Sequence, residues 1–492
     1  MTRQQYWIVA GVAALTMFIG VGVTVLATSG DDDEQSVQVV TSTSSTSTST
    51  TTLPPTTTSS TVAPVTTAGT TATTITPGTT LIIPPSTTAT TKPLPTTTTR
   101  PRPTTTTRAS TTTTSTTEPR GRTDVGITAT EIRLAVIADD SDTFQGMTAW
   151  RISVNRRGGI AERKVRLDLY ETGETAEGYV DALTTACDRN FAIVGSFSVF
   201  DVATDAVDCG EIPDLPVEAV AAEHMTAGNA FSPFPRQPDV DAVGPYRYLR
   251  DEIDGCCSQY VLVPDTEPSR GRTLARIDAA TAIGFDNAGM PDVSASDSES
   301  RYDELVTEME ANGATFAASG LGADSTLTLR RAAEGKAASV VAWFCDAECY
   351  DPSFLSEGGD AIDSQYVAIE TTPFSDRADI QSLRSYYRIT TREDDTPTYS
   401  GLRAYVTGML FERAAKSVVE AEGIDGLTRV RLLDALAGIH DFDAGGILGP
   451  TDVGARAPTG CYVLLQVQDG KFARVNPAEK GSLSCGGDNV LS

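Results

Sequence analysis

Short apolar runs alternate with helical stripes of apolar side chains from about residue 123 to the end of the chain. The first unit combines the nearly continuous apolar run 132–137 with Phe144, Met147, Trp150 and Val154, which recur at the spacing of one helix face. A short run of this kind is typical of a strand buried in a parallel sheet. The pattern therefore predicts a strand followed by a helix.

The alternation of strand and helix continues along the chain and then restarts near residue 260. Strands are expected at 165–169, 191–194, 215–220, 260–263, 292–295, 315–318 and 339–344. Helices are expected at 176–187, 199–209, 270–287, 302–312, 324–334, 376–390, 399–421 and 428–438. A hairpin at 462–475 turns at Asp469 and Gly470. Two successive β/α sets predict an α/β fold with two doubly wound parallel sheets flanked by helices.

The first 28 residues form a different kind of segment. The apolar run 7–27 has 21 residues without a charge, which is enough to cross a hydrocarbon core of about 30 Å. Arg3 precedes the run and acidic residues follow it at 31–34, so the remainder of the chain is expected outside the cell. A cleaved signal peptide ending near Ala27 explains the same pattern. The sequence predicts either a single transmembrane anchor or a secretory signal.

Residues 29–122 are almost entirely Thr, Ser and Pro. Such a segment buries too little apolar surface to offset its ordering entropy, so we expect a disordered stalk. Dense Thr with Pro is also typical of O-glycosylated stalks, and an unmodified spacer has the same composition. The globular part is therefore expected to begin near residue 123, on the extracytoplasmic side of the membrane.

The charge of the chain is concentrated in residues 123–492. This part has 31 Lys and Arg against 60 Asp and Glu, a net charge of −29. A domain this acidic offers no basic stripe for phosphates, so we expect no nucleic-acid partner. Enzyme signatures are missing as well, because the sequence has no G-x-S-x-G elbow, no P-loop and no H-E-x-x-H motif. We expect a protein that is not an enzyme and carries no cofactor.

All eight cysteines fall in residues 123–492. Their number is even and the predicted compartment is oxidising, so disulfide bonds are expected. Zinc binding is the competing interpretation, but neither His224 nor His440 lies at ligand spacing from a cysteine pair. We expect no metal site, and we expect His224 at the rim of a cleft and His440 on the surface at a helix end.

Five segments, in order, give the chain a recognisable family pattern. They are Asn155 with Gly158-Gly159-Ile160 and Arg163-Lys164, then 191–196, 229–233, 442–450 and 469–472. Together they resemble type I periplasmic binding proteins, in particular the branched-chain amino-acid (Leu/Ile/Val) binding family of ABC importers. The resemblance covers most of the chain from residue 123 to residue 475.

The resemblance implies two α/β lobes joined by three hinge crossovers, which close on a small polar ligand such as an amino acid and deliver it to an ABC permease. Lobe I would comprise 123–233 and 372–448, and lobe II would comprise 234–371 and 449–492. Disulfide bonds formed within each lobe would leave the hinge between the lobes free to move. The expected pairs are Cys187–Cys209, Cys345–Cys349 and Cys461–Cys485, which leaves Cys256 and Cys257 as a vicinal pair or as ends of other links.

Ligands of doubly wound sheets bind beyond the carboxyl ends of the strands. An amino acid needs hydroxyl and backbone N–H groups for its carboxylate and an acidic side chain for its ammonium group. The candidate residues in these loops are Asp139, Ser141, Ser196, Phe197, Ser198, Ala219 and Ala221 in the first lobe, and Asp265, Thr266, Asp346 and Glu370 in the second.

Several of these candidates have a simpler interpretation. Ser198 could only cap the helix expected after it, and Asp139, Asp265 and Asp346 could be solvated loop carboxylates. Phe197 could line an apolar pocket, whereas Phe144 and Phe200 are expected in the core. The loop 264–271 lacks the aromatic residue that often covers the ligand in this family. A membrane-tethered sensory or protein-interaction module with the same fold but without transport is therefore the alternative function.

Overall fold

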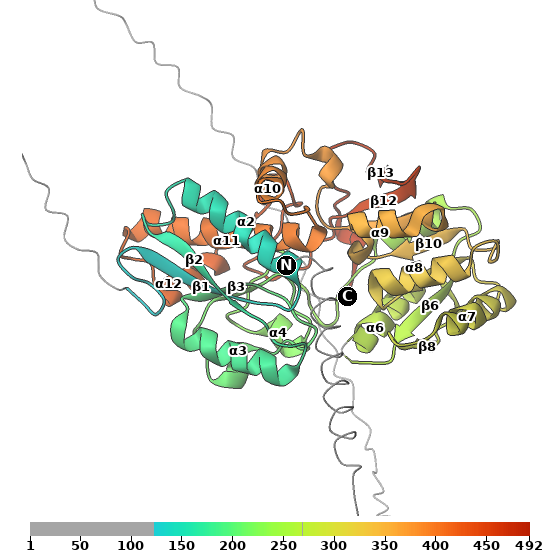
Figure 1. Ribbon diagram of the computed structural model, residues 1–492, viewed down its shortest axis with the longest axis horizontal. Helices are drawn as coiled ribbons and strands as arrows, with labels where there is room; N and C mark the ends of the chain where they lie inside the picture. The colour runs from blue at the N-terminus through green and yellow to red at the C-terminus, as the bar shows by residue number, and fades with distance from the viewer. Residues whose placement is uncertain (1–122, 268) are drawn as a thin grey trace, which may run out of the picture. The chain divides into compact units, whose positions relative to one another are not determined.

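The computed structural model describes residues 123–267 and 269–492 (Figure 1). The predicted anchor or signal at 1–28 and the predicted stalk at 29–122 lie outside the described residues. Among the helices that the structure does describe, none combines the length and the apolar character that crossing a bilayer requires.

The first sheet has four parallel strands in the order β2-β1-β3-β4. They are β1 (Glu131–Ile137), β2 (Lys164–Tyr170), β3 (Ala192–Ser196) and β4 (Asp214–Pro216). The predicted strands at 132–137, 165–169 and 191–194 are confirmed. The strand expected at 215–220 is shorter than predicted, because β4 ends at Pro216.

Helices α2 (Ser141–Arg156), α3 (Ala176–Arg189), α10 (Gln381–Arg392), α11 (Tyr399–Glu422) and α12 (Arg429–Ala437) accompany this sheet. Asp140 caps α2 by accepting a hydrogen bond from the backbone N of Thr143 at 2.7 Å. The buried stripe of α2 includes Met147 and Trp150 and packs in one core with buried residues of α11. The two helices lie next to each other in Figure 1. Gly408 of α11 makes this possible, because a Cβ there would lie 2.3 Å from the Trp150 ring.

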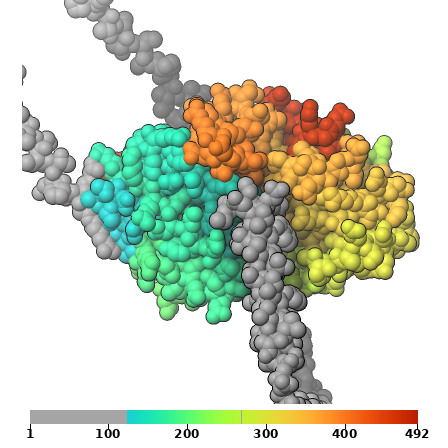
Figure 2. Space-filling view, viewed as in Figure 1, coloured from blue at the N-terminus to red at the C-terminus, as the bar shows by residue number. Residues whose placement is uncertain are grey.

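The second sheet has the order β13-β12-β11-β10-β9-β6-β7, with β8 paired to β6. Its strands are β6 (Ser258–Pro264), β7 (Asp286–Gly289), β8 (Asp292–Val293), β9 (Phe316–Ser319), β10 (Ala342–Cys345), β11 (Gln365–Ile369), β12 (Val463–Gln468) and β13 (Lys471–Asn476). The pairs among β6, β7, β9, β10 and β11 are parallel, as predicted, and the hairpin predicted at 462–475 is added at one edge, where β12 runs antiparallel to both β11 and β13. The Asp469-Gly470 turn, with positive φ at both positions, connects β12 to β13 as a hairpin. Figure 2 shows the β12–β13 hairpin (red) at the surface.

Helices α5 (Gly244–Glu252), α6 (Ser269–Ala282), α7 (Glu299–Ala311), α8 (Gly322–Ala332) and α9 (Pro352–Gly358) accompany the second sheet. Rings of Tyr246, Phe285, Phe316 and Phe344 pack together, with the Tyr246 and Phe344 centroids 4.8 Å apart. Two short strands, β5 (Asp241–Ala242) and β14 (Val490–Leu491), pair antiparallel and bring the C-terminal residues beside α5.

We call the first sheet with α2, α3, α4 (Ala222–Thr226) and α10–α12 lobe I, and the second sheet with α5–α9 lobe II. Between α4 and β5 the chain passes from lobe I to lobe II. It returns between β11 and α10, and passes again between α12 and β12. Buried residues of α10–α12 share one core with β1 and β3, although more than 150 residues separate them in the chain.

The helix expected at 199–209 was wrong. This segment holds only a single 3-10 turn, η1 (Thr204–Val207). Cys209 at its end is bonded to Cys187 of α3, and Asp201 accepts hydrogen bonds from the backbone N of Val220 and of Ala221. These long-range ties hold the segment as a loop against the adjacent strand connection.

Candidate functional site

A cavity of about 320 Å³ lies where lobe I, lobe II and the connecting segments meet. Lobe I contributes aromatic and charged side chains that include Phe197, Glu218, Tyr399 and Arg403. The lobe II lining includes Tyr246, Arg272, Arg276, Phe344 and Asp346. Arg236 and Glu370 come from the segments that connect the lobes.

Glu218, two residues beyond the end of β4, is the most contacted charge in this cavity. Its side chain is 4% exposed and forms ion pairs with Arg236, Arg272 and Arg403. Burial raises the pKa of Glu218, but the guanidinium groups of Arg272, Arg236 and Arg403 outweigh burial and hold the pKa well below its usual range. The carboxylate therefore stays ionised and joins lobe II, through Arg272 of α6, to lobe I, through Arg403 of α11.

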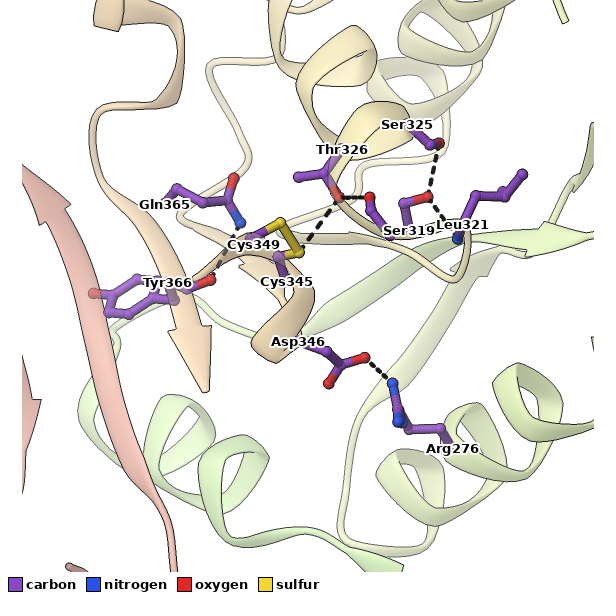
Figure 3. The surroundings of a disulfide bond; sticks show 11 residues. Arg276, Ser319, Leu321, Ser325, Thr326, Cys345, Asp346, Cys349, Gln365 and Tyr366 are labelled. Atoms are coloured by element: carbon purple, nitrogen blue, oxygen red, sulfur yellow. Dashed lines mark hydrogen bonds and ion pairs between the residues drawn. A yellow bond between two sulfur atoms is a disulfide. The ribbon is translucent and has the colours of Figure 1, made fainter. Parts of the chain in front are cut away.

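Two further ion pairs line the cavity. The guanidinium of Arg236 donates to both carboxylate oxygens of Glu370, at 2.7 and 3.0 Å. Asp346 directly follows Cys345 at the end of β10 and turns toward Arg276 of α6, with which it forms an ion pair (Figure 3). The bidentate geometry of the first pair is the arrangement in which arginine and carboxylate interact most strongly.

Three of the predicted site residues, Phe197, Asp346 and Glu370, line the cavity. Both acidic members of this set are already paired with arginine, as described above. An ammonium group bound by either carboxylate would share it with a guanidinium.

The two serines predicted to bind the ligand do not line the cavity. Ser196 is buried, with its hydroxyl 3.4 Å from Oδ1 of Asp214. The hydroxyl of Ser198 accepts a hydrogen bond from the backbone N of Phe200 at 3.1 Å. No helix begins at Ser198, so the helix-capping interpretation fails as well. Phe200, which was expected in the core, is exposed.

The remaining predicted positions also lie outside the cavity lining. Asp139 accepts hydrogen bonds from the backbone N and the hydroxyl of Thr172. Ser141, Asp265 and Thr266 are exposed loop or helix-start residues, Ala219 is buried, and Ala221 is half-buried.

His224 is buried in lobe I, so the expectation of a rim position was wrong. Its Nδ1 lies 2.6 Å from Oδ2 of Asp201 and its Nε2 lies 2.9 Å from Oδ2 of Asp214. Burial alone would lower the pKa of His224, but the two carboxylates outweigh burial and raise the pKa to about 10. The charged imidazole therefore ties the loop after β3, through Asp201, to β4, through Asp214. His440 is exposed beyond the end of α12, as expected, with Nδ1 2.6 Å from Asp452.

The arginines of the cavity were missed at the level of sequence. Arg272 and Arg276 are four residues apart on the helix after β6, which is the position where doubly wound sheets bind ligands. That signal was available in the sequence. Arg403 was not accessible in this way, because the fold brings it to Glu218 from 185 residues away.

All eight cysteines are paired, in the bonds Cys187–Cys209, Cys256–Cys257, Cys345–Cys349 and Cys461–Cys485. Each bond lies within one lobe, and Cys256 and Cys257 form the vicinal pair, which was one of two alternatives. Within the described residues, no group of three or more His, Cys, Asp or Glu side chains is placed to hold a metal ion.

The family model described as periplasmic binding protein matches residues 139–471 of this chain. This match includes β3, β4, the second sheet as far as the start of β13, and every cavity residue discussed above. No curated protein sequence matches the chain.

Solved structures with the same fold come from several bacteria. A fatty acid ABC transporter substrate-binding protein from Thermomonospora curvata is 16% identical, with a TM-score of 0.61 over 72% of this chain and 93% of that chain. A substrate-binding protein from Desulfitobacterium hafniense in complex with Leu is 15% identical and has a TM-score of 0.54. The match covers 70% of this chain and 100% of that chain. A leucine-binding protein from Thermotoga maritima is 14% identical and has a TM-score of 0.54. The match covers 70% of this chain and 99% of that chain.

Proposed function

This chain belongs to the periplasmic binding protein family, and we propose that it is an extracytoplasmic solute-binding protein that captures a small polar ligand, an amino acid or a similar solute, for an ABC importer. Lobe I would comprise 123–233 and 372–448, and lobe II would comprise 234–371 and 449–492. Residues 1–28 would anchor the protein to the membrane or direct its secretion, and residues 29–122 would act as the stalk. No catalytic role is part of this proposal.

The observation that carries the proposal is the cavity lined from both lobes and from their connections. One ion pair in its lining joins the two lobes, that of Glu218 of lobe I with Arg272 of lobe II. A ligand that enters between the lobes can therefore shift the balance between open and closed forms by contacting both sides. A fatty acid ABC transporter substrate-binding protein and a leucine-binding protein share this fold, which is consistent with a small organic solute here.

A second function, a sensory or interaction module that keeps the fold without transport, is favoured by one observation. The predicted serines do not line the cavity, and the two predicted acidic residues that do line it, Glu370 and Asp346, are ion-paired with arginine. The lining of this cavity therefore differs from the one expected for an amino acid.

Ligand-dependent thermal stability of the full-length chain separates the two functions. The panel would hold amino acids, amides, sugars, peptides and organic acids. A specific ligand at 100 times its Kd stabilises the folded state by about 2.7 kcal/mol, which raises Tm measurably. A Tm that does not respond to any member of the panel would count against the transport function and favour the sensory module.

A further inference from the structure

The cavity is rich in hydrogen-bond donors that the protein does not use. Its four guanidinium groups belong to Arg236, Arg272, Arg276 and Arg403, and each guanidinium carries five N–H donors. Among the described residues, Arg272 makes one ion pair, with Glu218, and Arg276 makes one, with Asp346. Nε of Arg403 is buried and has no hydrogen-bond acceptor within the described part of the chain.

The acidic groups of the cavity are mostly committed. Glu218 neutralises charge from three arginines, and Glu370 and Asp346 each pair with one. Asp241 also lines the cavity, and burial, the largest influence on it, raises its pKa and so disfavours its charged form. Glu348 is exposed at the edge of the lining. An ammonium group entering the cavity would have to share Glu218, Glu370 or Asp346 with a guanidinium group.

Arg272 and Arg276 lie on one face of α6, because residues four apart in a helix are neighbours. Their side chains are 38% and 29% exposed, so part of each remains open to the cavity. Rings of Phe197, Tyr246 and Phe344 contribute to the same lining. The cavity therefore combines two neighbouring guanidinium groups on α6 with aromatic side chains in the rest of its lining.

We infer that the solute is an organic anion with a carboxylate, an apolar body and no ammonium group, and that Arg272 and Arg276 bind its carboxylate. This inference rests on the proposed function. Planar guanidinium forks match carboxylate oxygens in a bidentate manner, and Glu218 demonstrates this affinity within the cavity by its contacts with three of the four arginines. Three of the five acidic side chains in the lining, Glu218, Asp346 and Glu370, already pair with arginine, which favours a ligand without an ammonium group over a zwitterion.

Two sets of matched compounds test the inference by isothermal titration calorimetry with the full-length chain at pH 7. The first set is 4-methylpentanoate, leucine and leucinamide, and the second is 3-phenylpropanoate, phenylalanine and phenylalaninamide. Within a set the apolar body is constant, while the carboxylate and the ammonium group are present or absent. We expect one of the two ammonium-free acids to bind at least tenfold more tightly than its amino acid, and we expect no binding of the amides.

Variants locate the binding group. Arg272→Gln and Arg276→Gln should each weaken binding of the preferred acid about tenfold, since each removes one charge-assisted hydrogen-bonding partner. Arg301→Gln is the matched control, because Arg301 lies on α7 with an exposed partner, Glu304, and does not line the cavity. Its affinity should equal that of the wild type.

The outcomes separate this inference from the function on which it rests. Tighter binding of an amino acid or an amide, or binding of only uncharged members of the wider panel, would overturn the anionic ligand and leave solute binding in place. Unchanged affinity of both arginine variants would overturn the assigned site. Absence of binding across the two sets and the wider panel would overturn the solute-binding function itself.

Discussion

The carboxylate of Asp376 is fully buried against the guanidinium of Arg474, whose Nε and Nη2 lie 3.0 and 2.6 Å from the same Oδ2 oxygen. That oxygen also accepts a hydrogen bond from the backbone N of Gly481 at 2.8 Å. Asp376 ends η4 (Phe374–Asp376), in the segment that leaves β11, whereas Arg474 belongs to β13. The pair therefore fixes the edge hairpin of lobe II to the chain that returns to lobe I.

Replacing Arg474 with Leu should lower the free energy of unfolding by about 3–5 kcal/mol, because it leaves the buried charge of Asp376 without its partner. Urea unfolding followed by fluorescence measures this loss. Arg301→Leu is the control, since the exposed Arg301–Glu304 pair is expected to contribute less than about 1 kcal/mol. Equal losses in the two variants would contradict the assigned role of the buried pair.

His224 predicts a dependence of stability on alkaline pH. The folded pKa of about 10 exceeds the unfolded value of about 6.5. The stability that the charged imidazole contributes is therefore complete below about pH 6.5 and is lost as pH rises through about 10. The difference in free energy of unfolding between wild type and His224→Gln should be largest near pH 6 and should shrink toward pH 10.

The exposed His440 serves as the control for this pH series. His440→Gln should leave the free energy of unfolding close to that of the wild type at every pH, since its pair with Asp452 is solvent-exposed. The difference in free energy of unfolding between wild type and His224→Gln could instead be constant from pH 6 to pH 10. That result would show that the two carboxylates do not hold the imidazole in its charged form.

Gly408 predicts a steric limit between α2 and α11. A methyl group at this position would meet the Trp150 ring at 2.3 Å, so Gly408→Ala should lower the free energy of unfolding by roughly 1–3 kcal/mol through overpacking. Gly228→Ala is the matched control, because a Cβ there would meet nothing within 4 Å. A Gly408→Ala protein as stable as the control would require the two helices to separate without cost.

Glu218 predicts that charge holds the lobes together in the absence of solute. Glu218→Gln removes the carboxylate shared by Arg272 of lobe II and Arg403 of lobe I, so the radius of gyration measured by small-angle X-ray scattering should increase. Because the folded pKa of Glu218 is depressed, its contribution is present above about pH 4.5 and is lost as pH falls further.

Glu412→Gln is the control for lobe opening. Glu412 is also buried and ion-paired, but its partners, Arg157 and Lys416, belong to lobe I. Its replacement should leave the radius of gyration unchanged. An equal response of both variants would show that the Glu218 contacts do not control the separation of the lobes.

The buried parallel strands could be predicted well from the sequence. A strand buried on both faces is a short apolar run, and this pattern is visible without knowledge of the fold. β1, β3 and β6 are short apolar runs that are buried on both faces. Prediction from the sequence failed where long-range contacts decide the local structure. β11 (Gln365–Ile369) was not recognised, and the helix expected after β3 is replaced by a loop that His224 and the Cys187–Cys209 bond hold in place.

The candidate site was harder to predict than the fold. Ligand loops could be located from strand ends, and this placed Phe197, Asp346 and Glu370 at the cavity. Which side chain in a loop faces inward depends on tertiary pairing that local patterns do not contain. Ser196 turns toward Asp214 instead of the cavity, and Arg403 reaches Glu218 only because α11 packs in lobe I.

The four sulfur bridges never cross from one half of the molecule to the other. The disulfide bonds can therefore stabilise each lobe against unfolding and proteolysis without linking the two lobes covalently. The contact between Glu218 of lobe I and Arg272 of lobe II is an ion pair, which can form and break reversibly. Reduction of the disulfide bonds would therefore destabilise the individual lobes, whereas low pH would weaken the Glu218–Arg272 ion pair between them. Covalent bonds thus stabilise the individual lobes, and an ion pair joins one lobe to the other.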